Sequence, residues 1–396
     1  MASLIVVVII LACAAIQYQW GTLVKAFAAI IAAICASIVA FSYFEVLANV
    51  FISRGDDSRF LSLVPWAQTL CFLLLLVVTF AILQTAIALL VRKPIDLGFL
   101  PERIGRVVCG ILLGLIISGL LLTAFEMAPL SVKWPYQRFD PLRLEPENPS
   151  RVLLNTDGLA TGLFSIISNG SLSGKRSFAT IHPDYLDQLF INRLINTGDT
   201  SIISSVSPAI VVPKPAVWPA SKTVGEQVAR FVSELKTRGG KLVYDQAGKS
   251  VPVPVSPNNG YDPMIVRVGI KKTAIRGAAK VNGGAFTPSQ LRLICKRKGY
   301  GKDRLAGKAI NIYPIGYLAA KDKIQMSPEI KIGTQDFEGN ARYIDFVFCV
   351  PNGFEPVLVQ FKLNSIVEIP TGPGAILTDV DDAPPPAILT EPSKSR

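Results

Sequence analysis

Residues that could carry enzymatic chemistry are few in this chain of 396 residues. Its one histidine is His182, and a histidine-dependent nucleophilic site also needs a serine or cysteine and an orienting acid. The sequence contains no Gly-Asp-Ser-Gly or Gly-x-Ser-x-Gly segment. Because Pro183 follows His182 at a predicted helix start, we interpret this histidine as a residue beside the helix rather than a base. We therefore predict no enzymatic activity and no catalytic residue.

Metal and cofactor sites are not expected either. Zinc needs several clustered histidines or cysteines, whereas four of the six cysteines lie in separate apolar segments. Gly283-Gly284 and Gly299-Tyr-Gly301 lack the lysine spacing of a phosphate-binding loop. An exported location would allow a disulfide between Cys295 and Cys349, but the alternation of side chains places them on different strand faces, which argues against one. The four expected to behave as small buried hydrophobes are Cys13, Cys35, Cys71 and Cys109.

The most basic stretch runs from Lys296 to Arg304 and contains one aromatic residue, Tyr300. Binding of single-stranded nucleic acid would combine such charges with several stacking rings. We instead expect a solvated hairpin loop, or a loop that touches anionic lipid headgroups. Nucleic acid is therefore not an expected partner, although the net charge of +11 lies mostly after Val132.

Any functional site in this chain must be positioned by elements that include long apolar segments. Half of its residues are hydrophobic and its mean hydropathy is +0.41, which is high for a soluble protein. About 20 apolar residues in a helix cross the hydrocarbon layer of a membrane. We predict four such spans, the first retained rather than cleaved as a signal peptide. They are Leu4 to Ile16, Thr22 to Phe44, Trp66 to Val91 and Arg103 to Phe125.

Small residues recur at every fourth position in two of these spans, so their backbones can approach neighbouring helices closely. Gly119 lies one position off the stripe in the fourth span, and we expect it to face lipid. Glu126 ends that span before Pro129, and we favour a solvated position at headgroup level, with a functional intramembrane acid as the alternative. The predicted helix-packing residues are Gly21, Ala28, Ala32, Ala36, Gly110, Gly114 and Ser118.

Basic residues beside the spans indicate the orientation of the chain in the membrane. Arg92, Lys93, Arg103 and Arg106 crowd into the short third loop. We therefore place this loop in the cytoplasm and the C-terminal part outside it.

The membrane part resembles the colicin V production protein (CvpA) family of bacterial membrane proteins over residues 1 to 130. The resemblance depends on Gly21 with Phe27 behind it, and on the Glu102-Arg103 pair that precedes Gly110 and Gly114. The chain departs from the family pattern at Trp20 and Arg106. The resemblance implies an inner-membrane location and an association with toxin production or export, or with envelope maintenance. It implies no catalytic or ligand-binding residue.

The remaining sequence indicates an α+β region that ends in an antiparallel β-sandwich. We expect a proline-broken linker over 131–150, a juxtamembrane helical region over 151–235, the sandwich over 260–370 and a disordered tail over 371–396. Short runs rich in β-branched residues, bounded by Gly, Pro and Asn, are typical of its strands, and Ile344, Phe346 and Phe348 should face the core. The predicted strands are 264–270, 290–296, 309–313, 343–348 and 357–363.

Together these observations favour a non-enzymatic protein in which four spans anchor an extracytoplasmic binding domain. The expected partners are the lipid bilayer and either another envelope protein or a second copy of the chain. A transporter or channel component is the alternative, and it would need a water-accessible path near Gln84 and the glycine stripe.

Overall fold

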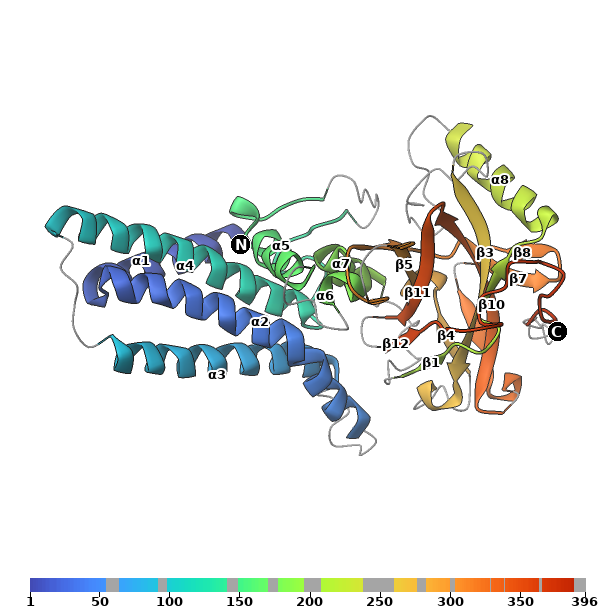
Figure 1. The fold of residues 1–396 in the computed structure, drawn as a ribbon, viewed down its shortest axis with the longest axis horizontal. Coiled ribbons are helices and arrows are strands. Elements are labelled where there is room, and N and C mark those ends of the chain that lie inside the picture. The colour runs from blue at the N-terminus through green and yellow to red at the C-terminus, as the bar shows by residue number, and fades with distance from the viewer. Residues whose placement is uncertain are drawn as a thin grey trace. The chain divides into compact units, whose positions relative to one another are not determined.

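The computed structural model describes residues 1–54, 64–91, 98–140, 149–169, 177–195, 208–237, 260–275, 283–299, 303–327, 329–337, 339–362 and 365–387. The chain forms two compact units, and each unit combines separate stretches of sequence (Figure 1). The helical unit contains Met1–Arg138, Pro149–Leu172 and Tyr185–Arg193; the sandwich unit contains the rest. This division differs from the expected linear order, because the juxtamembrane helical region is shared between the units.

Four long helices make up most of the helical unit. They are α1 (Ala2–Trp20), α2 (Leu23–Arg54), α3 (Ala67–Leu90) and α4 (Phe99–Met127). Each contains a stretch that is long and apolar enough to cross a membrane, so the four predicted spans are confirmed as long apolar helices. Glycine marks two helix boundaries: Gly21 separates α1 from α2, and Gly98 precedes α4 with a φ of +89°, a conformation that glycine adopts without strain.

Small residues lie where these helices approach one another. A Cβ atom on Gly110 would lie 2.6 Å from the Cα atom of Ala14, and one on Gly114 would lie 2.6 Å from the Cα atom of Ile10. Glycine is therefore needed for α1 and α4 to pack at this separation. In α2 the buried small residues are Ala26, Ala29, Ala32, Ala33, Ala36, Ser37, Ala40 and Ala48.

We expected Gly119 to face lipid because it lies off the glycine stripe, but the structure places it elsewhere. It is buried, and a Cβ atom there would lie 2.1 Å from the carbonyl oxygen of Thr156, the first residue of α5 (Thr156–Asn169). The expectation is wrong because a helix from the later sequence covers this side of α4.

Two short helices complete the helical unit through aromatic contacts. Phe164 of α5 stacks on Phe41 of α2, with ring centroids 4.7 Å apart. Tyr185, the first residue of α7 (Tyr185–Ile195), meets the edge of Phe44 at a centroid distance of 6.4 Å. These contacts attach helices from two separate stretches of sequence to the second long helix.

In the described part of the sandwich unit, the strands form three antiparallel sheets. The largest has the order β1 (Ile210–Val211), β3 (Tyr261–Lys271), β10 (Ala341–Pro351), β7 (Gly316–Ala320) and β8 (Lys323–Gln325), with β2 (Val217–Pro219) also paired to β3. The second has the order β12 (Ser365–Glu368), β11 (Phe354–Phe361), β5 (Leu291–Arg297) and β6 (Ala309–Ile312). The third pairs β4 (Gly284–Phe286) with β9 (Ile330–Ile332). The longer strands of these sheets, such as β3, β10 and β11, can be followed in Figure 1.

The main core lies between the faces of these sheets. Ile344, Phe346 and Phe348 of β10 are fully buried in it, as the alternating pattern predicts. Cys295 belongs to this core, whereas Cys349 belongs to an apolar cluster on the other face of β10, and both are free thiols. The alternation argument against a disulfide is therefore confirmed.

The C-terminal segment 371–387 differs from the expected disordered tail. Ala216 donates its N–H to the carbonyl of Ala375 at 2.8 Å, and Leu377 donates to the carbonyl of Val217 at 2.8 Å. Leu377 also packs partly against the apolar cluster that contains Cys349. Hydrogen bonds to β2 and apolar contacts hold this segment on the sandwich, while residues 388–396 lie outside the described part of the chain.

Candidate functional site

Buried polar and charged side chains gather in the helical unit around the last turn of α4. Glu126 is fully buried there, so its expected solvated position is wrong. Its electrostatic neighbours are Asp157 from α5, Arg138 from the segment that follows α4, and Arg193 from α7. These later segments cover the end of α4, which sequence position alone does not indicate. We name Glu126, Tyr136, Arg138, Asp157, Asp187 and Arg193 the charged cluster.

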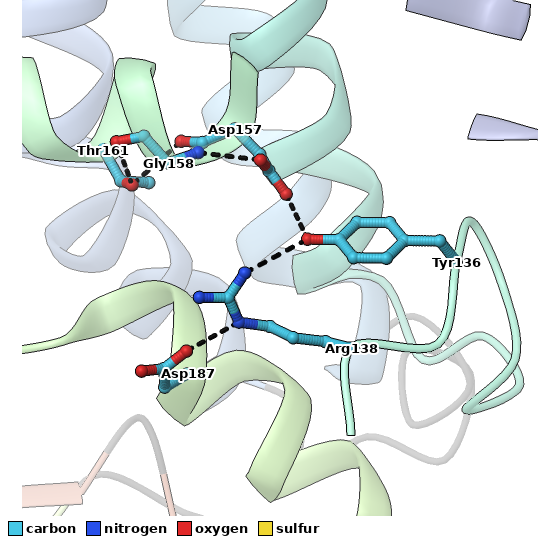
Figure 2. Close-up of polar contacts among 6 residues, drawn as sticks. All are labelled: Tyr136, Arg138, Asp157, Gly158, Thr161 and Asp187. Carbon is cyan, nitrogen blue, oxygen red and sulfur yellow. Dashed lines mark hydrogen bonds and ion pairs between the residues drawn. The ribbon is translucent and has the colours of Figure 1, made fainter. Parts of the chain in front are cut away.

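Asp157 occupies the first turn of α5 and is fully buried. Its Oδ1 accepts the N–H of Gly158 at 2.8 Å, and its Oδ2 accepts a hydrogen bond from the hydroxyl of Tyr136 (Figure 2). The hydroxyl of Thr161 donates to the carbonyl of Asp157 at 2.9 Å. Unpaired N–H groups and the helix dipole favour a carboxylate at this position, so the start of α5 provides part of the stabilisation that burial removes.

Arg138 connects Tyr136 to α7. Its Nη1 donates to the Tyr136 hydroxyl oxygen at 3.4 Å, and its Nε forms an ion pair with Asp187 Oδ1 at 2.6 Å (Figure 2). The ring of Tyr136 also packs against Phe190 of α7, with centroids 5.1 Å apart. Two consecutive hydrogen bonds therefore connect these side chains: Arg138 donates to Tyr136, and Tyr136 donates to Asp157.

Arg193 completes the charged cluster from the last turn of α7. Only 7% of this residue is exposed, and its Nη2 donates to the carbonyl of Ser131 at 3.1 Å. Its guanidinium also lies 6.0 Å from the ring centroid of Phe190. Arg193 thus attaches α7 to the segment that follows α4, close to Glu126.

Burial has opposite effects on the pKa values of these groups. It raises the pKa of Tyr136, and the carboxylates of Glu126 and Asp157 raise it further, so the phenol stays protonated and remains a donor. Burial alone would lower the pKa of Arg138, but Asp187 and Tyr136 outweigh it and the net effect is a raised pKa. Burial lowers the pKa of Arg193, while Glu126 opposes this effect. Both guanidinium groups remain charged, because an arginine pKa lies far above neutral pH.

The charged cluster is suited to holding segments together, because its two arginines lie among three carboxylates that come from α4, α5 and α7. Among the described residues, no group of three or more His, Cys, Asp and Glu side chains is placed to hold a metal ion.

The predicted helix-packing residues lie along the long helices and do not join the charged cluster. Ser118 is fully buried and donates its hydroxyl to the carbonyl of Leu115 at 3.0 Å. Ala32 and Ala36 are buried in α2, while Ala28 is partly buried. At Gly21 a Cβ atom would lie 2.6 Å from the carbonyl oxygen of Gln17, so this junction also requires glycine.

Glu102 makes a polar contact at the opposite end of α4. Its Oε1 accepts the N–H of Leu23, the first residue of α2, at 2.9 Å, and it also pairs with Arg106 at 2.7 Å. A carboxylate at a helix start satisfies a free N–H and interacts favourably with the helix dipole. Glu102 thereby acts as a cap for α2 from a distant part of the chain.

His182 lies in the sandwich unit directly after α6 (Phe178–Ile181) and is 2% exposed. Its neighbours include the ring of Phe178, at a centroid distance of 4.9 Å, and Arg292, whose Nη2 lies 3.5 Å from Nδ1. Arg292 in turn donates to Asn311 Oδ1 at 2.7 Å. The position beside a helix is as predicted, although the helix that follows begins at Tyr185.

The basic stretch 296–304 is more integrated into the sandwich unit than a solvated loop. Lys296 is 3% exposed and donates to the carbonyl of Asp303 at 2.6 Å. Arg304 donates to the carbonyls of Ile369 and Pro356 at 2.7 and 3.2 Å. Two of these cations therefore hold backbone segments together, while residues 300–302 lie outside the described part.

Sequence reasoning did not identify the members of the charged cluster other than Glu126. Tyr136 and Arg138 lie in a proline-broken stretch that was interpreted as a linker, and the others lie in short amphipathic helices. One available signal was Asp157 directly before Gly158 at the start of an apolar helix, a position where an acid is stabilised.

No family model matches this chain, and no match was found among curated proteins or solved structures.

Proposed function

We propose that this protein is a non-enzymatic, multi-pass protein of a bacterial inner membrane that holds a β-sandwich binding domain outside the cytoplasm. Four long apolar helices support insertion into a membrane. The resemblance to the CvpA family supports an association with toxin production or export, or with envelope maintenance. The proposed partners are the bilayer and an envelope protein or a second copy of the chain.

The observation that carries this proposal is the repeated passage of the chain between its two units. The chain passes between them five times, and three members of the charged cluster, Arg138, Asp187 and Arg193, lie at or within two residues of a passage in the sequence. Arg138 is the last residue of the helical unit before the first passage, and Arg193 is the last before the final one. Asp187, two residues after the chain returns at Tyr185, pairs with Arg138 at 2.6 Å.

This connectivity differs from that of a tethered domain, which follows its anchor through a single flexible linker. Within the helical unit, the ion pair between Arg138 and Asp187 joins residues that lie next to two of the passages. The repeated connections support a protein whose membrane part and sandwich act as parts of one molecule rather than as independent modules.

The residues that carry the family resemblance also have roles in the helical unit. Glu102 caps the helix that Gly21 precedes, and Gly110 and Gly114 lie against α1. Their positions fit the packing role proposed for them. This agreement supports the proposal without depending on the sandwich.

Labelling of a cysteine on the sandwich tests the membrane location and the sidedness together. Lys331 is an exposed residue of β9, and we propose Lys331→Cys in the full chain. A membrane-impermeant maleimide should label this variant in intact spheroplasts, whereas the parent chain provides the background from native cysteines. Labelling only after permeabilisation would place the sandwich in the cytoplasm, and recovery of the chain in the soluble fraction would overturn the proposal.

A transporter or channel component is the second candidate, and one observation favours it. Glu126 and Asp157 are carboxylates buried together at the end of a membrane-spanning helix, as in proton-conducting sites. Proton flux into proteoliposomes that falls in Glu126→Gln and Gln84→Ala chains would support this candidate. Flux equal to that of protein-free liposomes would remove it.

A further inference from the structure

The described C-terminal segment ends on an ion pair of the sandwich unit whose carboxylate is fully buried. Arg267 of β3 and Asp345 of β10 are cross-strand partners, joined by contacts of 2.6 Å (Nε to Oδ1) and 2.8 Å (Nη2 to Oδ2). Asp345 is fully buried, and the Arg267 guanidinium lies over the ring of Trp218 at 5.1 Å from its centroid. The arginine is thus oriented by a carboxylate on one side and an aromatic ring on the other.

Both charged groups also bind main-chain atoms of the C-terminal segment. Arg267 Nη2 donates to the carbonyl of Pro385 at 2.6 Å, and Asp345 Oδ2 accepts the N–H of Ala387 at 2.8 Å. The ion pair therefore recognises one carbonyl and one N–H group two residues apart. Recognition of this kind depends on backbone conformation rather than on a particular side chain.

Proline explains why this segment suits the ion pair. Residues 384–386 are all proline, so none has an N–H group and each has a restricted φ. Ala387 is the first residue after them that can donate to Asp345. Proline runs favour an extended polyproline conformation, and less conformational entropy is therefore lost when such a segment binds.

The two ends of the segment are held in different ways. At the first end, Ile376 forms a parallel bridge with Val217 of β2, and Leu377 packs on the apolar cluster. Between the ends, the exposed side chains are those of Thr378, Asp379, Asp381 and Asp382. The final residues can therefore leave the ion pair while the bridge at Ile376 remains in place.

We propose that Trp218, Arg267 and Asp345 form a binding site for extended, proline-rich peptide segments, and that residues 384–387 occupy this site within the same chain. A partner segment would present prolines followed by a residue with a free N–H, in competition with the chain's own tail. The inference deepens the proposed function, since it names the partner chemistry of the sandwich. Its test does not depend on the membrane or its sidedness, so the two proposals can fail separately.

The test measures binding of a fluorescein-labelled peptide of residues 380–396 to the full chain in detergent, by fluorescence anisotropy. Ala387→Pro in the chain removes the N–H that Asp345 accepts and should release the tail. Ala387→Ser keeps the N–H and is the matched control. Loss of a hydrogen bond to a charged group changes an equilibrium by about tenfold or more, so the Ala387→Pro chain should bind the peptide about tenfold more tightly than the other two.

A second chain and a second peptide complete the test without altering the site. A chain that ends at Val380 lacks the competing segment and should bind the peptide at least as tightly as the Ala387→Pro chain. A peptide with proline in place of Ala387 should bind this shortened chain about tenfold more weakly. Equal binding of the two peptides, or no binding to either opened chain, would overturn the proposal.

Discussion

The hydroxyl of Tyr136 donates a hydrogen bond to Asp157, a carboxylate that is fully buried at the start of α5. Tyr136 lies in the segment that leaves the membrane helices, so one hydrogen bond joins that segment to a helix that comes later in the chain. The raised pKa of Tyr136, caused by burial and by the nearby carboxylates, keeps this donor protonated. The contact is therefore a fixed part of the charged cluster.

Replacing Tyr136 by phenylalanine should destabilise the helical unit. The change leaves the ring contact with Phe190 intact but removes a donor from a buried carboxylate, which costs about 1–3 kcal/mol. Thermal unfolding of the purified protein in detergent measures the loss. Tyr43→Phe is the control, because Tyr43 is exposed on α2. Equal melting temperatures for the two variants would contradict the role of the hydrogen bond.

Leucine at the close helix contacts should disrupt packing at three glycines. Gly110→Leu and Gly114→Leu would push α1 from α4, and Gly119→Leu would meet the backbone of α5. We expect lower protease resistance and earlier thermal aggregation in detergent for all three. Gly162→Ala in α5 is the matched contrast, because a Cβ atom there has no neighbour within 4 Å. It should be neutral or stabilising by up to about 1 kcal/mol, and a harmless Gly119→Leu would contradict the contact with α5.

Substitution of Glu102 should weaken the start of α2 in a graded way. Glutamine keeps an oxygen that can accept the N–H of Leu23 but loses the charge that pairs with Arg106. Alanine loses both contacts. We expect melting temperatures in the order wild type, Glu102→Gln, Glu102→Ala, and amide exchange at Leu23 should increase in the same order. An alanine variant with wild-type exchange would show that Glu102 does not cap the helix.

Lys362 should make the sandwich unit less stable at neutral pH than at alkaline pH. Burial lowers its pKa to about 8, whereas an unfolded lysine has a pKa of about 10.4. Between these pH values the unfolded chain binds more protons at Lys362 than the folded chain does. The free energy of unfolding therefore rises as the pH increases from about 8 to about 10.4. Below pH 8 the cost of the buried charge is present in full.

Lys362→Met should therefore raise the free energy of unfolding at pH 7 by about 1–2 kcal/mol and have little effect near pH 10.5. Part of the gain is offset by loss of the contact between the Lys362 ammonium and the Phe361 ring, which lie 5.6 Å apart. Thermal melting followed by tryptophan fluorescence at both pH values measures the difference, with Lys321→Met at an exposed lysine for comparison. A gain in stability that is the same at both pH values would contradict the lowered pKa of Lys362.

The parts of the fold that depend on local pattern could be predicted from the sequence. Four apolar stretches of sufficient length predict the long helices, and the alternation of Ile344, Phe346 and Phe348 predicts the buried face of β10. Short strands such as β1 and β2 were not predicted, because they have two and three residues and gain stability only by pairing with β3.

The charged cluster could not be predicted in the same way, because its members are distant in sequence. Arg138 and Asp187 form their ion pair across 49 positions, and Tyr136 and Asp157 are 21 apart. Glu126 illustrates the difficulty: its place beside Pro129 suggested solvent, but later helices bury it. Local propensity predicts how a segment folds, whereas burial of a charge depends on which other segments cover it.

The interleaving of the two units restricts how this protein can exchange parts during evolution. No continuous stretch of its gene encodes the helical unit or the sandwich unit alone, because residues 149–172 and 185–193 belong with the membrane helices. A recombination event at any one position would therefore transfer an incomplete unit and leave charges such as the buried Glu126 or the partly buried Asp187 without their neighbours. The two units should be inherited together, as one gene segment rather than as separable modules.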